Sequence, residues 1–194
     1  MLVETLGTAV AVGKLRGGKV LNLSEISIKY WEWMVASGLI EGIAAYIRKA
    51  EIEPIWPLVD QHIFLIHLLT YSLLFCTILV NRKEKGFVWI LLGVFLNFLV
   101  IMANGGRMPV DTSNINQELY PATIALLENG KDLTHGLMTE HTRLKFLGDI
   151  IHLQKPYPLP KSLSIGDLWM MLGIFIFIQD KMVVSSGREN SQIH

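Results

Sequence analysis

Long apolar stretches separated by short polar turns dominate the chain. Residues 63–80 contain no charged side chain, and neither do residues 87–103, in which Asn97 is the strongly polar member. A helix needs about 20 largely apolar residues to cross the hydrocarbon layer of a bilayer. The first stretch meets this length when it is extended back to Leu58. The basic turn at residues 81–86 joins it to the second stretch in a predicted helical hairpin.

Three further stretches have a helical composition. Residues 164–184 surround a wholly apolar run and are long enough to cross. Residues 28–47 are largely apolar but contain three charged side chains, and residues 2–13 are short and contain Glu4. The basic region that opens a signal peptide is missing, so we expect the first helix to be retained. The pattern predicts an all-α, multi-pass transmembrane helical bundle of five helices, with four as the alternative count.

Basic residues in the short loops predict the orientation, because they concentrate on the cytoplasmic side. Three lie in the central turn and three at residues 14–19, which places both loops in the cytoplasm. The N-terminus is then outside and the C-terminus inside. Residues 104–163 form a structured extracytoplasmic loop within a single membrane domain, residues 1–194, because a loop this long is rarely an idle connector.

Two proline-containing segments give the outer loop a predicted local structure. Pro121 is typical of the first position of a short helix, and Gly130 is typical of its exit. The proline-rich residues 156–160 predict a stiff, extended segment that leads the chain into the last helix.

Composition narrows the functional classes. The 194 residues include 17 basic and 17 acidic side chains, and the resulting zero net charge argues against a nucleic-acid partner. The single cysteine, Cys76, lies in an apolar run, and we expect a buried, inert thiol. His62 and His67 are five residues apart, which is not the spacing of a helical metal pair. We therefore expect no metal and no cofactor, and a lipid bilayer as the partner.

Asn97, Asn104 and Arg107 form the first candidate site. The two asparagines are seven residues apart and share a helix face, and Arg107 follows at the outer end. Polar groups at membrane depth often mark a function. The alternative is that the asparagines join helices by hydrogen bonds while Arg107 anchors at the headgroups. We expect Arg107 to pair with a carboxylate of the outer loop, preferably Asp149.

Asp149 and Asp167 belong to a second and a third candidate site. Apolar neighbours at residues 146–151 indicate that Asp149 is pressed against protein or membrane, although a simple turn is the alternative. Ser164 and Asp167 precede an apolar run in the pattern of a helix-capping box. A carboxylate in the first helical turn also suits the helix dipole, so capping competes with a functional role.

Several of these residues belong to strings that resemble a family of small multi-pass bacterial membrane proteins. The Asn-Gly-Gly-Arg-Met-Pro-Val string is fairly specific. The strings lie at residues 15–19, 104–110, 142–144, 146–151 and 164–167. The family is catalogued only as a domain of unknown function. Membership implies a location in the bacterial cytoplasmic (inner) membrane and supplies no activity.

The last third of the chain also resembles the lipoprotein signal peptidases, which are intramembrane aspartyl proteases. Asn104 and Arg107 are similar to polar residues of that family, and Asp149 and Asp167 are similar to its catalytic dyad. Ser164 stands where the family has an asparagine, and a long insert precedes the Asp149 segment. The resemblance implies that the two aspartates meet at the outer face of the bundle and share one proton.

Two functions of different classes follow. The first is a non-catalytic accessory or interaction protein of the bacterial membrane, with an unidentified membrane-protein or lipoprotein partner. The second is an intramembrane aspartyl peptidase that uses Asp149 and Asp167, with Asn97, Asn104, Arg107 or Ser164 in binding roles. A transporter is a distant third, because five helices without evident repeats make a poor one.

Overall fold

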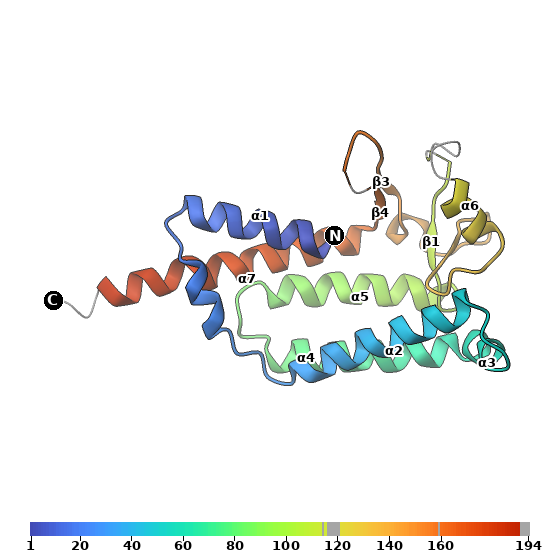
Figure 1. Ribbon diagram of the computed structural model, residues 1–194, viewed down its shortest axis with the longest axis horizontal. Coiled ribbons are helices and arrows are strands. Elements are labelled where there is room, and N and C mark those ends of the chain that lie inside the picture. Colours follow the sequence, from blue (N-terminus) through green and yellow to red (C-terminus); the bar gives the residue numbers. More distant parts are fainter. Residues whose placement is uncertain (114, 116–120, 159, 191–194) are drawn as a thin grey trace.

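The computed structural model describes residues 1–113, 115, 121–158 and 160–190, and most of them are helical. Figure 1 shows long helices lying side by side along the length of the molecule. These helices are α1 (Leu2–Leu15), α2 (Trp31–Lys49), α4 (Ile63–Val80), α5 (Phe87–Ala103) and α7 (Ile165–Asn190). They correspond to the five stretches that the hydrophobic pattern predicts as helical. Shorter helical segments are η1 (Val20–Glu25), α3 (Trp56–Gln61), α6 (Pro121–Glu128) and η2 (Lys145–Leu147).

Short strands make the all-α prediction incomplete. Strand β1 (Met108–Val110) pairs in parallel with β2 (His135–Leu137), and β3 (Ile151–Leu153) pairs antiparallel with β4 (Lys161–Leu163). Three residues are too few to show the period-two alternation by which a strand is recognised in a sequence. These strands, η2 and α6 belong to the cap, which we define as the described part of residues 104–163.

The cap confirms one local prediction and corrects another. Helix α6 begins at Pro121, and Gly130 follows its end with a φ of +61°. The proline-rich segment, in contrast, connects the antiparallel strands β3 and β4. The predicted extended lead into α7 is therefore wrong, because the chain doubles back there and strand β4 leads into the helix. Residue 159 of that segment lies outside the described residues.

Glycines set the packing of α7 on α5. A Cβ atom on Gly93 would lie 2.4 Å from the carbonyl oxygen of Gly166, and one on Gly173 would lie 2.6 Å from that of Gly86. The two helix backbones therefore touch, as small residues allow in helix pairs that pack closely. Because Gly166 faces Gly93, α7 begins beside the middle of α5, about 15 Å before the end of α5 at 1.5 Å per residue.

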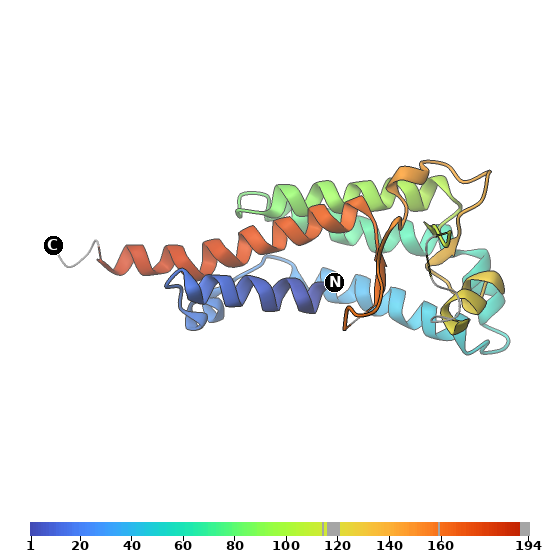
Figure 2. The ribbon, with the colours of Figure 1, turned by 90° about the horizontal axis from the view of Figure 1, so that it is seen from above.

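The two ends of the bundle differ in what they contain. One end, the basic end, holds the turn at residues 81–86, the loop at residues 16–19 and the latter part of α7, and ion pairs such as Lys85–Asp180 link them. The opposite end, the cap end, holds α3 and much of the cap (Figure 2). The loops that were predicted to share one side of the membrane thus share one end of the molecule.

The outer surface of the bundle is unusually apolar. Within the described residues, α4 is the helix that is both long and apolar enough to cross a membrane, and only 28% of it is buried. Helix α5 is also apolar but has 17 residues. Cys76 on α4 is exposed, so its predicted burial is wrong. The run of apolar neighbours reflects a surface that faces outward instead of a core.

Candidate functional site

Asn97 on α5 lies at the centre of a buried hydrogen-bond network with the start of α7. Its side-chain amide donates to Oδ1 of Asp167 over 3.1 Å, and its Oδ1 accepts from the hydroxyl of Ser164 at 2.8 Å. The backbone N–H of Ser164 donates to Oδ2 of Asp167, and the backbone N–H of Asp167 donates to the Ser164 hydroxyl, both over 3.0 Å. The last two bonds are the capping box that the sequence indicates.

This network has two consequences for Asp167. Both of its carboxylate oxygens already accept hydrogen bonds. Asp167 also lies near the middle of α5, because α7 begins there, whereas the sequence placed it at the outer boundary of the bundle. Asp167 is thus a capping residue that is set well into the bundle.

Asp149 is buried in the cap, as its apolar flanks indicate. Its backbone N–H donates to the carbonyl of Pro109 over 2.8 Å, and its carbonyl accepts from the N–H of Asp111 at 3.0 Å. The segment at residues 146–151 therefore pairs with the Asn-Gly-Gly-Arg-Met-Pro-Val string. Its side chain is 7% exposed, and Oδ2 lies 3.7 Å from Nε2 of His135.

Burial and two neighbouring charges shift the pKa of Asp149. Burial raises the pKa of Asp149 to about 6, the positive charge of His135 lowers it in part, and the negative charge of Asp167 raises it further. Asp149 and Asp167 are thus close enough to influence each other electrostatically. The direct neighbour of the Asp149 carboxylate, however, is His135.

His135 and Asp132 belong to the same group of polar residues as Asp149, and the sequence did not predict them as site residues. Nδ1 of His135 lies 3.3 Å from Oδ1 of Asp132, and that oxygen accepts from the backbone N–H groups of Thr134 and His135. Burial alone lowers the pKa of His135, but the hydrogen bond to Asp132 and the nearby carboxylate charges outweigh this effect and raise the pKa. A histidine therefore bridges Asp132 and Asp149.

A second histidine–carboxylate pair lies between α2 and α4. His67 is fully buried, and its Nδ1 is 3.8 Å from Oε1 of Glu41. Neither ring nitrogen has a hydrogen-bond partner within the part of the chain that the structure describes. A buried polar group without a partner costs about 1–3 kcal/mol. The sequence signal for this pair was Glu41 itself, a charge inside a largely apolar stretch.

Asn104 has a structural role at the end of α5. Its side-chain amide donates to the carbonyls of Val100 and Arg143, and its Oδ1 accepts from the backbone N–H of Arg143, all within 2.9 Å. It thereby fastens the segment at residues 142–144 to the end of the helix. Asn97 and Asn104 have different partners, so the shared helix face does not bring them into one site.

Arg107 does not pair with Asp149, and that prediction is wrong. Its Nη2 donates to Oδ1 of Asp60 on α3 over 2.7 Å. The same oxygen lies 3.3 Å from Nε of Arg48, a buried residue of α2. Asp149 is instead held by its own backbone pairing and faces His135. The partner of Arg107 therefore comes from α3, outside the predicted loop.

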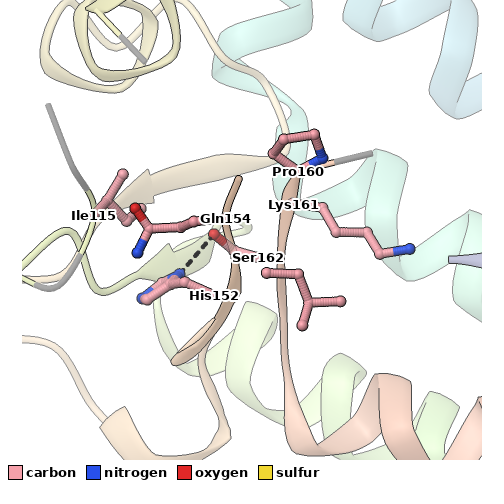
Figure 3. Close-up of a pocket in the computed structure, with 7 residues that line it drawn as sticks. Ile115, His152, Gln154, Pro160, Lys161 and Ser162 are labelled. Carbon is pink, nitrogen blue, oxygen red and sulfur yellow. Dashed lines mark hydrogen bonds between the residues drawn. The ribbon is translucent and has the colours of Figure 1, made fainter. Parts of the chain in front are cut away.

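A small cavity of about 90 Å³ lies beside strands β3 and β4. In Figure 3, His152 and Ser162 face each other across the two strands, with Nδ1 and Oγ separated by 2.8 Å, while Lys161 points away. Lys161 forms an ion pair with Glu4 of α1. Because His152 and Ser162 are register partners in the antiparallel pair, their hydrogen bond is a cross-strand contact that fastens the hairpin.

The polar contacts thus fall into three sets. Asp132, His135 and Asp149 lie within the cap, Glu41 and His67 pair between α2 and α4, and the Asn97 network joins α5 to the start of α7. Among the described residues, no group of three or more His, Cys, Asp or Glu side chains is placed to hold a metal ion.

These features define a mostly helical protein with a candidate membrane-spanning helix and a small capping unit. A family model described as a family of unknown function (DUF5317) matches residues 25–179, and the chain belongs to this family. The predicted membership of a family without assigned activity is confirmed.

One curated relative and the solved structures complete the comparison. An uncharacterized protein of Thermotoga maritima is 31% identical over 109 residues, which are 56% of this chain and 60% of that protein. The chain therefore spans about 60% of the length of this relative. No solved structure matches the chain. Neither the family nor the relative supports the resemblance to signal peptidases.

Proposed function

We propose that this chain is a multi-pass protein of the bacterial inner membrane with a non-catalytic, accessory or interaction role. The observation that carries the proposal is α4, which has a mean hydropathy of 2.3 although only 28% of it is buried. An apolar helix in the core of a water-soluble protein would be covered by its neighbours. Large exposed apolar surfaces mark contact with a membrane or a partner.

The distribution of side chains on the other helices supports the same proposal. Exposed apolar side chains also occur on α2, α5 and α7, including Leu39, Phe95 and Leu172. Fully buried positions, in contrast, include the polar residues His67, Thr70 and Ser164. An apolar outside with polar groups turned inward suits a helical bundle in lipid.

The proposed orientation places the basic end in the cytoplasm and the cap outside. The basic-residue bias of the short loops supports it, and so does the separation of these loops from the cap. In this position the cap closes the outer end of the bundle and offers its surface to partners outside the cytoplasm.

A non-catalytic role suits the geometry of the aspartates better than the peptidase alternative. An aspartyl dyad needs two carboxylates that share one proton. Asp167 has both oxygens occupied by the Asn97 network and the cap of α7, and Asp149 faces His135. Their contacts support roles in fastening the cap to the bundle.

Membrane insertion is tested first by extraction. The full chain is expressed in a bacterial host, and its membranes are washed with alkaline carbonate. The protein is expected to stay in the pellet and to dissolve only in detergent. Release into the alkaline supernatant together with peripheral proteins would contradict membrane insertion.

Cysteine labelling then tests the orientation. Single cysteines replace Lys83 at the basic end or Glu140 in the cap, in a Cys76→Ala background, and intact cells receive an impermeant thiol reagent. Labelling is expected at position 140 and not at position 83, while both positions react after lysis. Labelling at position 83 alone would reverse the orientation.

A further inference from the structure

The cap contains a groove of about 340 Å³ next to the end of α5. Leu127 and Leu137 are among its apolar lining residues. Its polar lining consists of Asn104, Arg107, Thr139, His141 and Thr142. The two threonines belong to one turn, because the Thr139 N–H donates to the Thr142 hydroxyl over 2.8 Å. Hydroxyl, imidazole and guanidinium groups therefore line one concave surface.

Arg107 has N–H donors that its described hydrogen bonds do not use. A guanidinium group carries five N–H donors in a fixed fork, and the described hydrogen bonds of the Arg107 side chain use Nη2 alone, toward Asp60. The side chain is 30% exposed, so part of the fork is accessible from the groove. This arginine is thus only partly neutralised.

Arg107 shares its carboxylate with a second arginine. Asp60 lies between Arg107 and the buried Arg48. Glu51, whose carboxylate lies 4.0 Å from Arg48, also pairs with Lys131. Within this set of ion pairs, three cations thus share two carboxylates, so Arg107 has no carboxylate of its own.

We propose that this groove binds the phosphate group of a small ester or of a lipid headgroup. Arginine is suited to phosphate because its planar fork can contact two oxygens at once. The threonine hydroxyls and His141 are further groups of the kind that contact phosphate or headgroup oxygens, while Leu127 and Leu137 suit the adjoining carbon atoms.

Binding of a lipid headgroup rests on the proposed membrane location. Binding of a free phosphate ester does not depend on that location. Asn104 directly follows the last residue of α5, and Arg107 lies three residues further along the chain. If α5 crosses the bilayer, these residues lie at the depth of the lipid headgroups. The groove would then hold an anionic headgroup of the outer leaflet against the cap.

Binding is tested on the full chain in a neutral detergent. Inorganic phosphate and glycerol 1-phosphate are titrated by calorimetry at constant ionic strength, with chloride as the reference anion. In a separate arm, the protein is placed in nanodiscs of phosphatidylcholine with or without phosphatidylglycerol, and the thermal midpoint is measured. The nanodisc arm requires membrane insertion, and the titration arm does not.

Arg107→Gln is expected to weaken phosphate binding by at least about tenfold, because a charge-assisted hydrogen bond is lost. Arg82→Gln, which removes an exposed arginine at the basic end, is the matched control and is expected to bind normally. His141→Ala touches no ion pair and is expected to weaken binding about threefold. It keeps the test valid if Arg107→Gln fails to fold.

Each outcome decides the proposal. An Arg107-dependent response to soluble phosphate identifies a free anion site, and an Arg107-dependent response to phosphatidylglycerol alone identifies a headgroup site. Absence of any response in both arms, or an equal response in the wild type, Arg107→Gln and His141→Ala, overturns the groove as a phosphate site. If the alkaline carbonate wash releases the protein but phosphate still binds, only the proposed membrane location is contradicted.

Discussion

One ion pair at the basic end of the molecule, Lys85–Asp180, has an exposed cation, whereas one at the cap end, Arg48–Asp60, has a buried cation. The Lys85–Asp180 pair has a lysine that is 67% exposed. Asp60, in contrast, joins Arg107 to Arg48, whose side chain is 8% exposed. Exposed pairs contribute little because water and salt screen them. Buried pairs are costly to break because a charge is left without a partner. The cap end is therefore expected to be the more sensitive end.

The largest expected effect comes from removing the shared carboxylate. Asp60→Ala removes the carboxylate that the buried Arg48 shares with the partly exposed Arg107 and is expected to lower the free energy of unfolding by about 3 kcal/mol. Asp180→Ala removes the partner of Lys85 and is the matched control, with an expected loss below about 1 kcal/mol. Unfolding of the purified protein in detergent, followed by circular dichroism, measures both. Equal losses would show that the two ends do not differ.

The next effect tests the glycine contact between the two ends. Gly93→Ala would place a Cβ atom 2.4 Å from the Gly166 carbonyl oxygen, and overpacking of this kind costs about 1–3 kcal/mol. Gly42→Ala on α2 is the control, because no atom lies within 4 Å of the new Cβ. It is expected to be neutral or to stabilise by up to about 1 kcal/mol. The same unfolding measurement applies, and a loss in Gly42→Ala as large as that in Gly93→Ala would contradict the close contact.

A smaller effect is expected from the Asn97 network. Asn97→Ala removes the acceptor of the Ser164 O–H and the donor to one Asp167 oxygen, at a cost of about 2 kcal/mol. Adding Ser164→Ala removes an O–H group whose acceptor is already gone, so the double variant is expected to lose less than the sum of the single losses. Additive losses in the double-mutant cycle would show that the residues do not act as one network.

The smallest expected effect is a pH dependence from the cap. The folded pKa of Asp149, about 6, lies above its ordinary value, so the folded state binds more protons than the unfolded state between about pH 4 and 6. Stability contributed by protonated Asp149 is therefore lost as the pH rises through this window. The raised pKa of His135 acts in the same direction, since its contribution is lost as the pH rises through the folded pKa.

Asp149→Asn is expected to flatten this dependence, because the titrating carboxyl group is removed. Thermal unfolding at a series of pH values measures the slope, with Asp180→Asn at the basic end as the control. An unchanged slope in Asp149→Asn would contradict the assignment.

Local patterns determined the elements of this protein and part of the candidate site. The five apolar stretches predict the long helices, because helix formation and hydrophobic burial depend on neighbouring residues. The spacing of Ser164 and Asp167 indicates a capping box for the same reason, and the apolar flanks of Asp149 indicate its burial. Family membership also follows from the sequence. All of these features depend on residues that lie close together in the chain.

Tertiary structure alone decided which distant groups meet. Arg107 pairs with Asp60, which lies 47 residues away, and Glu41 reaches His67 across two helices. No local pattern encodes such pairs, because they depend on how α2, α3, α4 and the cap pack together. The depth of α7 beside α5 likewise follows from the contact of Gly166 with Gly93, and this contact moved Asp167 from the expected rim to the interior of the bundle.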